Sequence, residues 1–340
     1  MKERKVYIDI AKAIAILLVV SGHIIYFCIG QEDLDFSRRF ILQELLSYIE
    51  MPLFVICSAL VSKSKIDDTF VLKNELEKKF RTLIVPFLLF GFIYALFSGS
   101  TIHHFLYNTM KLGYWYLLLL FELHLINYLS LYINRLFEKC RRPFLSDCLF
   151  MVVVYLLITF VYRGTDPEAI SWKNMLGLLK LKQYYLMFFF IIFLKRYNLV
   201  DRIFFNRNLF TVALIISVII LICNSLDVHF YGRSYIMPWT LTIVVLYAIR
   251  QIADNKCFMG GGTKLLICIG QSSMDIYLIH FFFINSMNLS FLMPIMNRVT
   301  DLVGSSVIVF PIAILVTCFS MITGKIIRKS EILNKLIFYK

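Results

Sequence analysis

Ten apolar stretches recur along the 340-residue chain, and this pattern limits the folds open to it. A helix that crosses the hydrocarbon core of a bilayer needs about 20 predominantly apolar residues. Hydrophobic residues make up 59% of the chain and charged residues only 17%, against roughly 45–50% and 25% in soluble domains. The sequence therefore predicts an all-α, polytopic membrane protein of about ten transmembrane helices, forming one integral membrane domain over residues 1–340. The stretches are 6–29, 40–62, 83–98, 114–133, 144–162, 183–195, 208–225, 234–250, 264–286 and 304–325.

The distribution of basic residues predicts how these spans are oriented. Cytoplasmic loops of membrane proteins carry an excess of Lys and Arg. With the N-terminus inside, 25 of the 35 Lys and Arg residues fall in inner segments, 9 fall in outer segments, and Lys12 lies within a span. We therefore expect both termini in the cytoplasm, and we attribute the net charge of +13 to topology and membrane lipid, with no nucleic-acid partner. The exception is the outer segment 163–182, which holds four basic residues.

Ionisable side chains inside the predicted spans are the main functional candidates, since each costs at least about 2.5–3.5 kcal/mol on insertion scales. In the first span, Asp9, Lys12 and His23 share one helix face at about 100° per residue. His23 stands about 16 Å above Lys12, near the outer boundary. Ile16 and Val19 lie between them, and this apolar middle suits a pantetheine arm or ordinary helix packing. The alternative for the polar residues is that Asp9 and Lys12 neutralise each other and that His23 is interfacial.

The ninth predicted span places a second histidine at a depth similar to that of His23. Ser273, Tyr277 and His280 are spaced i, i+4, i+7 and form one face of a helix. An interhelical hydrogen bond is the alternative explanation for His280. Two histidines at one depth favour a functional role.

Two further acidic residues fall inside predicted spans. Pro52 predicts a kink beside Glu50 in the second span, and Glu122 lies deeper in the fourth span than the aromatic belt that includes Trp115. A structural ion pair or a protonated carboxyl group explains either acid equally well. No His-x-x-x-His or His-x-x-Glu pattern occupies one helix face, and the eight cysteines lack metal-binding spacing, so no metal is expected.

The inner segment VLKNELEKKFRTLIVPF carries a basic cluster at the mouth of the third span. Lys78 and Arg81 lie about one helical turn apart in it. They are candidates for binding the phosphates of a cytoplasmic donor. The alternative is that the cluster only marks the inner side and touches anionic lipid.

Five segments, in order, resemble the acyltransferase-3 family, the integral membrane O-acyltransferases that decorate bacterial surface sugars. YIDIAKAIAILLVVSGH is similar to the family's basic residue followed about three turns later by His, met here by Lys12 and His23. EMPLFVICSA resembles its MPLFF-x-x-SG stretch, KKFRTLIVP its basic-x-x-Arg segment, YWYLLLLFE its tryptophan-bearing segment, and IGQSSMDIYLIH its G-x-x-S-x-x-IYL-x-H segment. Two positions depart from the family: Ala59 replaces the usual Gly after the Ser, and Glu50 stands where a His often precedes Met-Pro-Leu.

The resemblance implies an enzyme of the bacterial plasma membrane that transfers an acyl group, usually acetyl from acetyl-CoA, to a hydroxyl of an extracytoplasmic sugar, lipid-linked glycan or polysaccharide, such as capsule or exopolysaccharide. His23 would be the general base or a transient acyl carrier, with Asp9 orienting Lys12. Lys12, Lys78 and Arg81 would bind the phosphates of coenzyme A. The acceptor and oxyanion contacts implied are Glu50, Ser58, Trp115, Glu122, Ser273, Tyr277 and His280.

Other functions are compatible with buried charges on kinked helices. A transporter or flippase of a glycan precursor uses such residues to line a substrate path. A catalytically idle acyltransferase scaffold acting as a sensor is a third interpretation, and the pair Lys12 and His23 argues against it. The sequence leaves open whether the chain forms a homodimer.

Overall fold

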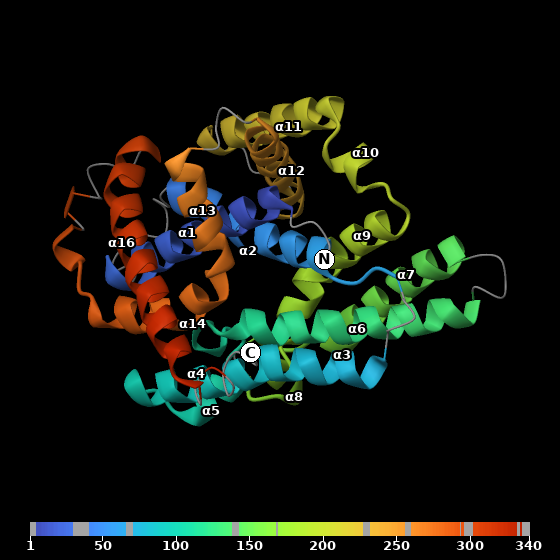
Figure 1. The fold of residues 1–340 in the computed structure, drawn as a ribbon, viewed down its shortest axis with the longest axis horizontal. Helices are drawn as coiled ribbons and strands as arrows, with labels where there is room; N and C mark the ends of the chain where they lie inside the picture. The colour runs from blue at the N-terminus through green and yellow to red at the C-terminus, as the bar shows by residue number, and fades with distance from the viewer. Residues whose placement is uncertain are drawn as a thin grey trace. The chain divides into compact units, whose positions relative to one another are not determined.

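The computed structural model describes residues 5–29, 41–65, 71–137, 143–167, 169–226, 232–255, 260–292, 294–295, 302–331 and 334. The regular elements within these residues are all helical (Figure 1). Within the described part of the chain, eight helices are long and apolar enough to cross a membrane, or nine if one bent pair counts as a single span. The predicted all-α polytopic membrane protein is therefore confirmed. The basic segments 1–4, 138–142 and 335–340, used above for orientation, lie outside the described residues.

The sixth predicted span is a helix of suitable length but unusual composition. Helix α9 (Leu178–Arg196) is 19 residues long and covers this span. It is not among the eight, because basic residues stand at both of its ends. These are Lys180, Lys182, Lys195 and Arg196.

The ninth predicted span is broken, so the prediction of one straight helix there is wrong. Helices α13 (Gly261–Gln271) and α14 (Ser273–Ser286) meet at an angle of 80°. The break falls at Ser272, whose backbone leaves the helical series at φ −95° and ψ 7°. Because Ser273, Tyr277 and His280 all belong to α14, their common face survives the break.

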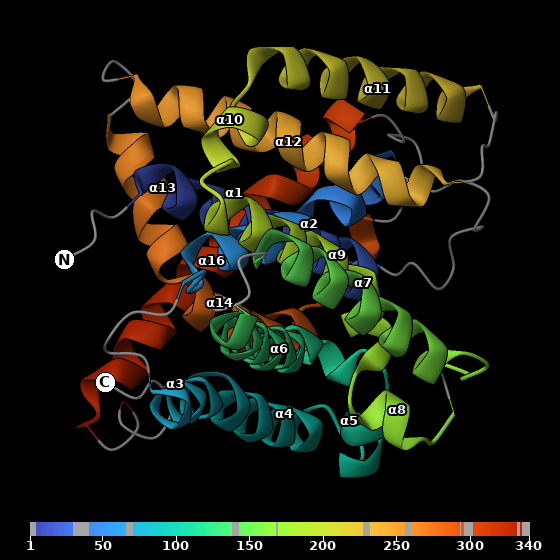
Figure 2. The same cartoon turned by 90° about the vertical axis from the view of Figure 1, so that its right-hand side faces the viewer.

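The chain divides into two compact units, which are described separately. The first unit comprises residues 1–57 and 199–325. Its helix α1 packs against α12, α13 and α14, and α11 and α12 lie side by side (Figure 2). Its elements are α1 (Val6–His23), the π-helix η1 (Ile24–Cys28), most of α2 (Ile41–Val61), α10 (Val200–Phe204), α11 (Arg207–Ser225), α12 (Arg233–Asp254), α13, α14, η7 (Ser290–Leu292) and most of α16 (Leu302–Lys329).

Two glycines allow close helix contacts in the first unit. A β-carbon on Gly270 of α13 would stand 1.9 Å from the carbonyl oxygen of Asp9 in α1. A β-carbon on Gly324 of α16 would stand 2.6 Å from the β-carbon of Asp275 in α14. Only glycine permits these approaches, so both buried aspartates lie where helix backbones meet.

The second unit comprises residues 58–198 and 326–340. Its segment after α4 turns back along that helix: the ring of Phe105 lies 5.0 Å from that of Phe87 and occupies the space beside Gly91. Its other helices are α3 (Leu72–Lys79), the π-helix η3 (Phe80–Ile84), α4 (Val85–Phe97), α5 (Ile102–Tyr107), the 3₁₀-helix η4 (Lys111–Gly113), α6 (Trp115–Phe137), α7 (Pro143–Tyr162), α8 (Trp172–Met175) and α9.

A buried lysine joins two loop segments of the second unit. The Lys111 side chain is 1% exposed, and its Nζ donates to the carbonyl oxygens of Leu106 and, at 2.8 Å, Asn174. The Asn174 amide in turn donates to the carbonyl of Ala169 at 2.7 Å. Lys111 and Asn174 thereby join the two loop segments. Asn174 belongs to segment 163–182, the predicted outer segment with four basic residues.

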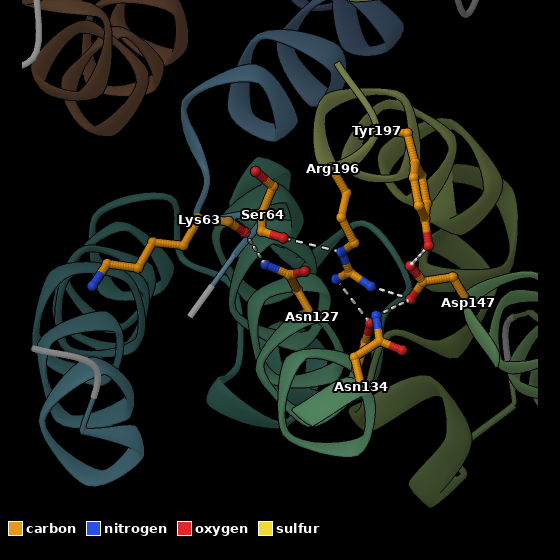
Figure 3. Close-up of polar contacts among 8 residues, drawn as sticks. Lys63, Ser64, Asn127, Asn134, Asp147, Arg196 and Tyr197 are labelled. Carbon is orange, nitrogen blue, oxygen red and sulfur yellow. Dashed lines mark hydrogen bonds and ion pairs between the residues drawn. The ribbon is translucent and has the colours of Figure 1, made fainter. Parts of the chain in front are cut away.

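A polar network in the second unit fixes the end of α2 (Figure 3). The guanidinium of Arg196 pairs with Asp147, and its Nε donates to the carbonyl of Ser64 at 3.0 Å. Asp147 also accepts from Tyr197 at 2.9 Å and from Asn134 at 2.5 Å. The last carbonyls of a helix have no partner within it, and here the Nζ atom of Lys195 in α9 donates to the carbonyl of Leu60, near the end of α2, at 2.6 Å.

Candidate functional site

Two histidines predicted to lie at one depth are in contact in the first unit. The Nδ1 atom of His23, at the end of α1, lies 3.0 Å from the Nε2 atom of His280 in α14. The ring planes are only 6° apart. His280 is fully buried, and its Nδ1 lies 2.9 Å from the carbonyl oxygen of Ile276. His23 retains partial exposure, so it is the member of the pair that a substrate can approach.

Contacts between η1 and the last turn of α14, together with the residues that follow it, hold the pair in place. The backbone N–H of Leu289 donates to the carbonyl of Cys28 at 3.0 Å. The Cys28 thiol donates to the carbonyl of Ile284 at 3.5 Å. The ring of Phe281 packs against both imidazoles, 4.6 Å from His23 and 4.3 Å from His280. These contacts fix the mutual orientation of the two rings.

Glu50, predicted as an acceptor contact, packs against the residue that precedes His23. Its Oε2 is 3.1 Å from the position that a β-carbon on Gly22 would occupy. Gly22 directly precedes His23, so the carboxyl group of α2 packs on α1 at this level. The missing side chain at Gly22 is what admits it.

The lower part of α1 is arranged only partly as predicted. The helix runs without a break from Val6 to His23, so Lys12 lies about 16 Å from His23 along its axis. Asp9 is 6% exposed, and Lys12 is half-buried. Both lie close enough to the Cys57 thiol of α2 to interact with it electrostatically. Ile16 and Val19 are 0% and 1% exposed. Helix packing therefore accounts for the apolar middle, and these residues do not line an open passage.

The other predicted residues of α14 lie close to the pair. Tyr277 is buried, with its ring centroid 6.0 Å from that of His280. Ser273 is half-buried at the first turn, beside the break in the helix. Both therefore belong to the helix that presents His280.

Ser58 and Trp115 belong to the second unit. The Ser58 hydroxyl lies 2.9 Å from the Tyr116 hydroxyl, a partner that the sequence did not indicate. Trp115 is 8% exposed; its ring stacks with Tyr184 at 5.6 Å and carries the Lys180 ammonium at 4.7 Å. Little of the indole is open to a ligand, because packing already covers it.

Glu122 is the other predicted acid of the second unit. Its side chain points into the interior, where the charge of Lys111 acts on it. The Oε2 atom makes no hydrogen bond within the described part of the chain. No pattern in the sequence indicated Lys111 as a neighbour of Glu122, because a lone lysine in a loop has no periodicity.

The two donor-binding candidates lie on an exposed surface. Lys78 is exposed in α3, and Arg81 lies in the π-helix η3. The Arg81 guanidinium contacts Glu77 at 2.6 Å, and the two side chains are 51% and 44% exposed. They are accessible to a polar ligand from the surrounding solvent.

Two of the predicted motifs contain or adjoin a π-helical turn, which the sequence did not indicate. One follows His23 directly, and the other contains Arg81. Such turns are rare and frequently occur at functional sites. Among the described residues, no cluster of three or more His, Cys, Asp or Glu side chains forms a metal site.

Comparison with known proteins assigns the chain to a family. The model of the acyltransferase 3 family, described as an acyltransferase domain, matches residues 5–325. No curated protein and no solved structure matches the chain. Because the family model covers nearly the whole sequence and both units, the chain belongs to the acyltransferase 3 family and is a multi-pass membrane acyltransferase.

Proposed function

We propose that this acyltransferase moves an acetyl group from cytoplasmic acetyl-CoA to a hydroxyl of an extracytoplasmic sugar, in the plasma membrane of a bacterium. Family membership supplies the acyl-transfer reaction. The observation that supports the chemistry is the contact between His23 and His280 at the end of α1. With the N-terminus inside, as the basic residues predict, this pair faces the outer side. The acceptor is therefore a surface glycan or its lipid-linked precursor.

His23 is the group that activates the acceptor. A sugar hydroxyl is a poor nucleophile until a base removes its proton. In direct transfer, His23 takes this proton as the sugar oxygen bonds to the thioester carbonyl carbon. The carbon–sulfur bond then breaks, and the coenzyme A thiolate leaves and receives the proton from His23. If the acyl group passes through His23, a ring nitrogen bonds the carbonyl carbon as the carbon–sulfur bond breaks and the coenzyme A thiolate leaves. The sugar oxygen then takes the acyl group as the nitrogen–carbon bond breaks, and the hydroxyl proton goes to the thiolate.

Donor and acceptor contacts come from the remaining candidates. Lys12 lies too low on α1 to reach the sugar and is assigned to the donor, oriented by Asp9. Lys78 and Arg81 are assigned to the phosphates of coenzyme A, and their exposure supports this role. Because Ile16 and Val19 are packed, the pantetheine arm takes a route other than the face they form.

The acceptor and oxyanion contacts are assigned to the polar residues around the pair and in the second unit. Glu50 packs against Gly22, which directly precedes His23, and Tyr277 neighbours His280. A hydroxyl group such as that of Tyr277 stabilises an oxyanion when it points at the reacting carbonyl. The remaining assignments are Ser58, Trp115, Glu122 and Ser273.

Gene deletion tests this proposal directly. Mass spectrometry of surface glycans from the deletion strain is expected to show loss of an acetyl increment. The wild-type gene restores the increment, and His23→Ala does not. His104→Ala is the matched control, since His104 is exposed on α5, and it restores fully.

Two results would contradict the proposal. An unchanged glycan mass profile in the deletion strain would show that a surface sugar is not the acceptor. Full restoration by His23→Ala, at equal protein level, removes the catalytic role of His23. Loss of an acyl increment other than acetyl would show that the donor is a different acyl-CoA, and the proposed mechanism would stand.

A further inference from the structure

The hydrogen bonds of His280 determine which of its nitrogens carries a proton. Its Nδ1 lies 2.9 Å from the carbonyl oxygen of Ile276, which can only accept. Nδ1 of His280 is therefore the donor. In the neutral ring the other nitrogen, Nε2, then holds a lone pair.

This lone pair fixes the tautomer of His23. Nε2 of His280 lies 3.0 Å from Nδ1 of His23, so Nδ1 of His23 must carry the proton in that contact. The ring centroids are 5.2 Å apart, 2.2 Å more than the two nitrogens. With planes only 6° apart, the rings meet edge to edge, as a hydrogen bond in the ring plane requires. His23 is left with its lone pair on Nε2.

Resting on the proposed function, we infer that His280 is a positioning residue that holds His23 in the tautomer whose Nε2 is the reacting base. A carboxylate fills this position in the Ser-His-Asp arrangement, where it orients the histidine without taking its proton. Here a neutral imidazole, itself oriented by the Ile276 carbonyl, does the same. His280 thus acts through His23 and does not touch the acceptor, because it is fully buried.

The reaction keeps the same hydrogen bond throughout. When Nε2 of His23 takes the hydroxyl proton, Nδ1–H continues to donate to His280. The proton then leaves from Nε2 to the coenzyme A thiolate, and the starting tautomer returns. The contacts of Cys28 with Ile284 and Leu289 hold the two helices in register during this cycle.

Two substitutions separate positioning from simple packing. His280→Met fills the site but removes the acceptor, and kcat is expected to fall about 10²–10⁴-fold, the range of general-base catalysis, with the KM for acetyl-CoA changed less than about threefold. His280→Gln offers an amide oxygen near the former Nε2 position and is expected to recover at least about tenfold over His280→Met. His124→Met removes another buried imidazole, outside the pair, and controls for the loss of a buried ring.

Nitrogen NMR of the detergent-solubilised protein, labelled with ¹⁵N-histidine, reads the tautomer itself. The signal missing in His23→Ala identifies His23. In the wild type its Nδ1 is expected to be protonated and its Nε2 unprotonated, and in His280→Met the population shifts toward protonated Nε2. Unprotonated Nδ1 in the wild type overturns the inference. So does wild-type kcat in a folded His280→Met variant, or no gain from Gln over Met.

These readouts distinguish the inference from the function on which it rests. If the deletion strain keeps its glycan acetylation, the proposed function fails, whereas the NMR result still decides the tautomer. If acetylation is lost but His23 has the other tautomer, the enzyme assignment stands and the role of His280 is wrong.

Discussion

The carbonyl oxygen of Asp9 stands 1.9 Å from the position that a β-carbon on Gly270 would occupy. Helices α1 and α13 therefore approach at a distance that no other residue allows. The same α1 carries Lys12 and His23. The position of the candidate base depends on this contact as well as on its own neighbours.

Gly270→Ala is expected to destabilise the protein by about 1–3 kcal/mol, since overpacking forces a helix backbone to move. The matched control is Gly262→Ala in the same helix, where a β-carbon meets nothing within 4 Å. Thermal unfolding in detergent measures both. Equal unfolding temperatures for Gly270→Ala and the wild type would contradict the close contact.

The buried ammonium of Lys111 predicts a pH-dependent stability. Burial lowers its pKa from 10.5 to about 8, while the charge of Glu122 acts in the opposite direction. Between about pH 8 and 10.5 the unfolded chain keeps a proton that the folded protein has released. Stability therefore rises with pH across this interval, and the cost of the buried charge is fully present below pH 8.

Lys111→Met removes this contribution to the pH dependence. We expect the variant to lose more stability relative to the wild type at pH 9.5 than at pH 7.5, because only the wild type gains over that range. It also loses the donor to the carbonyls of Leu106 and Asn174. Unfolding temperatures of both proteins at the two pH values give the comparison, and a constant difference would show that Lys111 does not titrate in this interval.

The fold class could be predicted from the sequence because it depends on local composition and spacing. For His23 and His280 the sequence indicated a similar depth, but not their direct contact. Apolar length predicts the spans, and the asymmetry of Lys and Arg between loops predicts their orientation. The contact between the two histidines agrees with the common depth inferred from residue counts. Their proposed roles remain predictions.

The features that the sequence did not indicate arise from tertiary packing. The 80° break at Ser272, the π-helical turns beside His23 and around Arg81, and the burial of Lys111 all depend on segments far apart in the chain. Ile16 and Val19 show the same limit: a helix face that suits a ligand arm also suits a neighbouring helix, and only the packed structure distinguishes them.

The buried pair of Asp147 and Arg196 is expected to be a major stabilising contact of the second unit. The two side chains are 5% and 9% exposed. Asp147→Asn leaves the guanidinium uncompensated and is expected to cost about 3–5 kcal/mol. The exposed pair of Glu77 and Arg81 gives the control: Glu77→Gln is expected to cost about 0–1 kcal/mol. Chemical denaturation in mixed micelles compares them, and similar losses would mean that burial does not distinguish the two pairs.

Arg81 allows donor binding to be tested apart from stability. Its guanidinium is half-exposed and contacts Glu77 at 2.6 Å in a solvent-exposed ion pair, so Arg81→Gln should leave the unfolding temperature nearly unchanged. If the guanidinium binds coenzyme A phosphates, the KM for acetyl-CoA rises about tenfold, with kcat nearly constant, because a charge-assisted bond of roughly 1.5–3 kcal/mol is lost. Acetyl-pantetheine, which lacks the nucleotide phosphates, should be used equally well by both proteins. Glu77→Gln releases Arg81 from its ion pair, so its KM for acetyl-CoA should be equal to or below that of the wild type. The same preference for acetyl-CoA over acetyl-pantetheine in wild type and Arg81→Gln would place the phosphate site elsewhere and leave η3 as a structural turn.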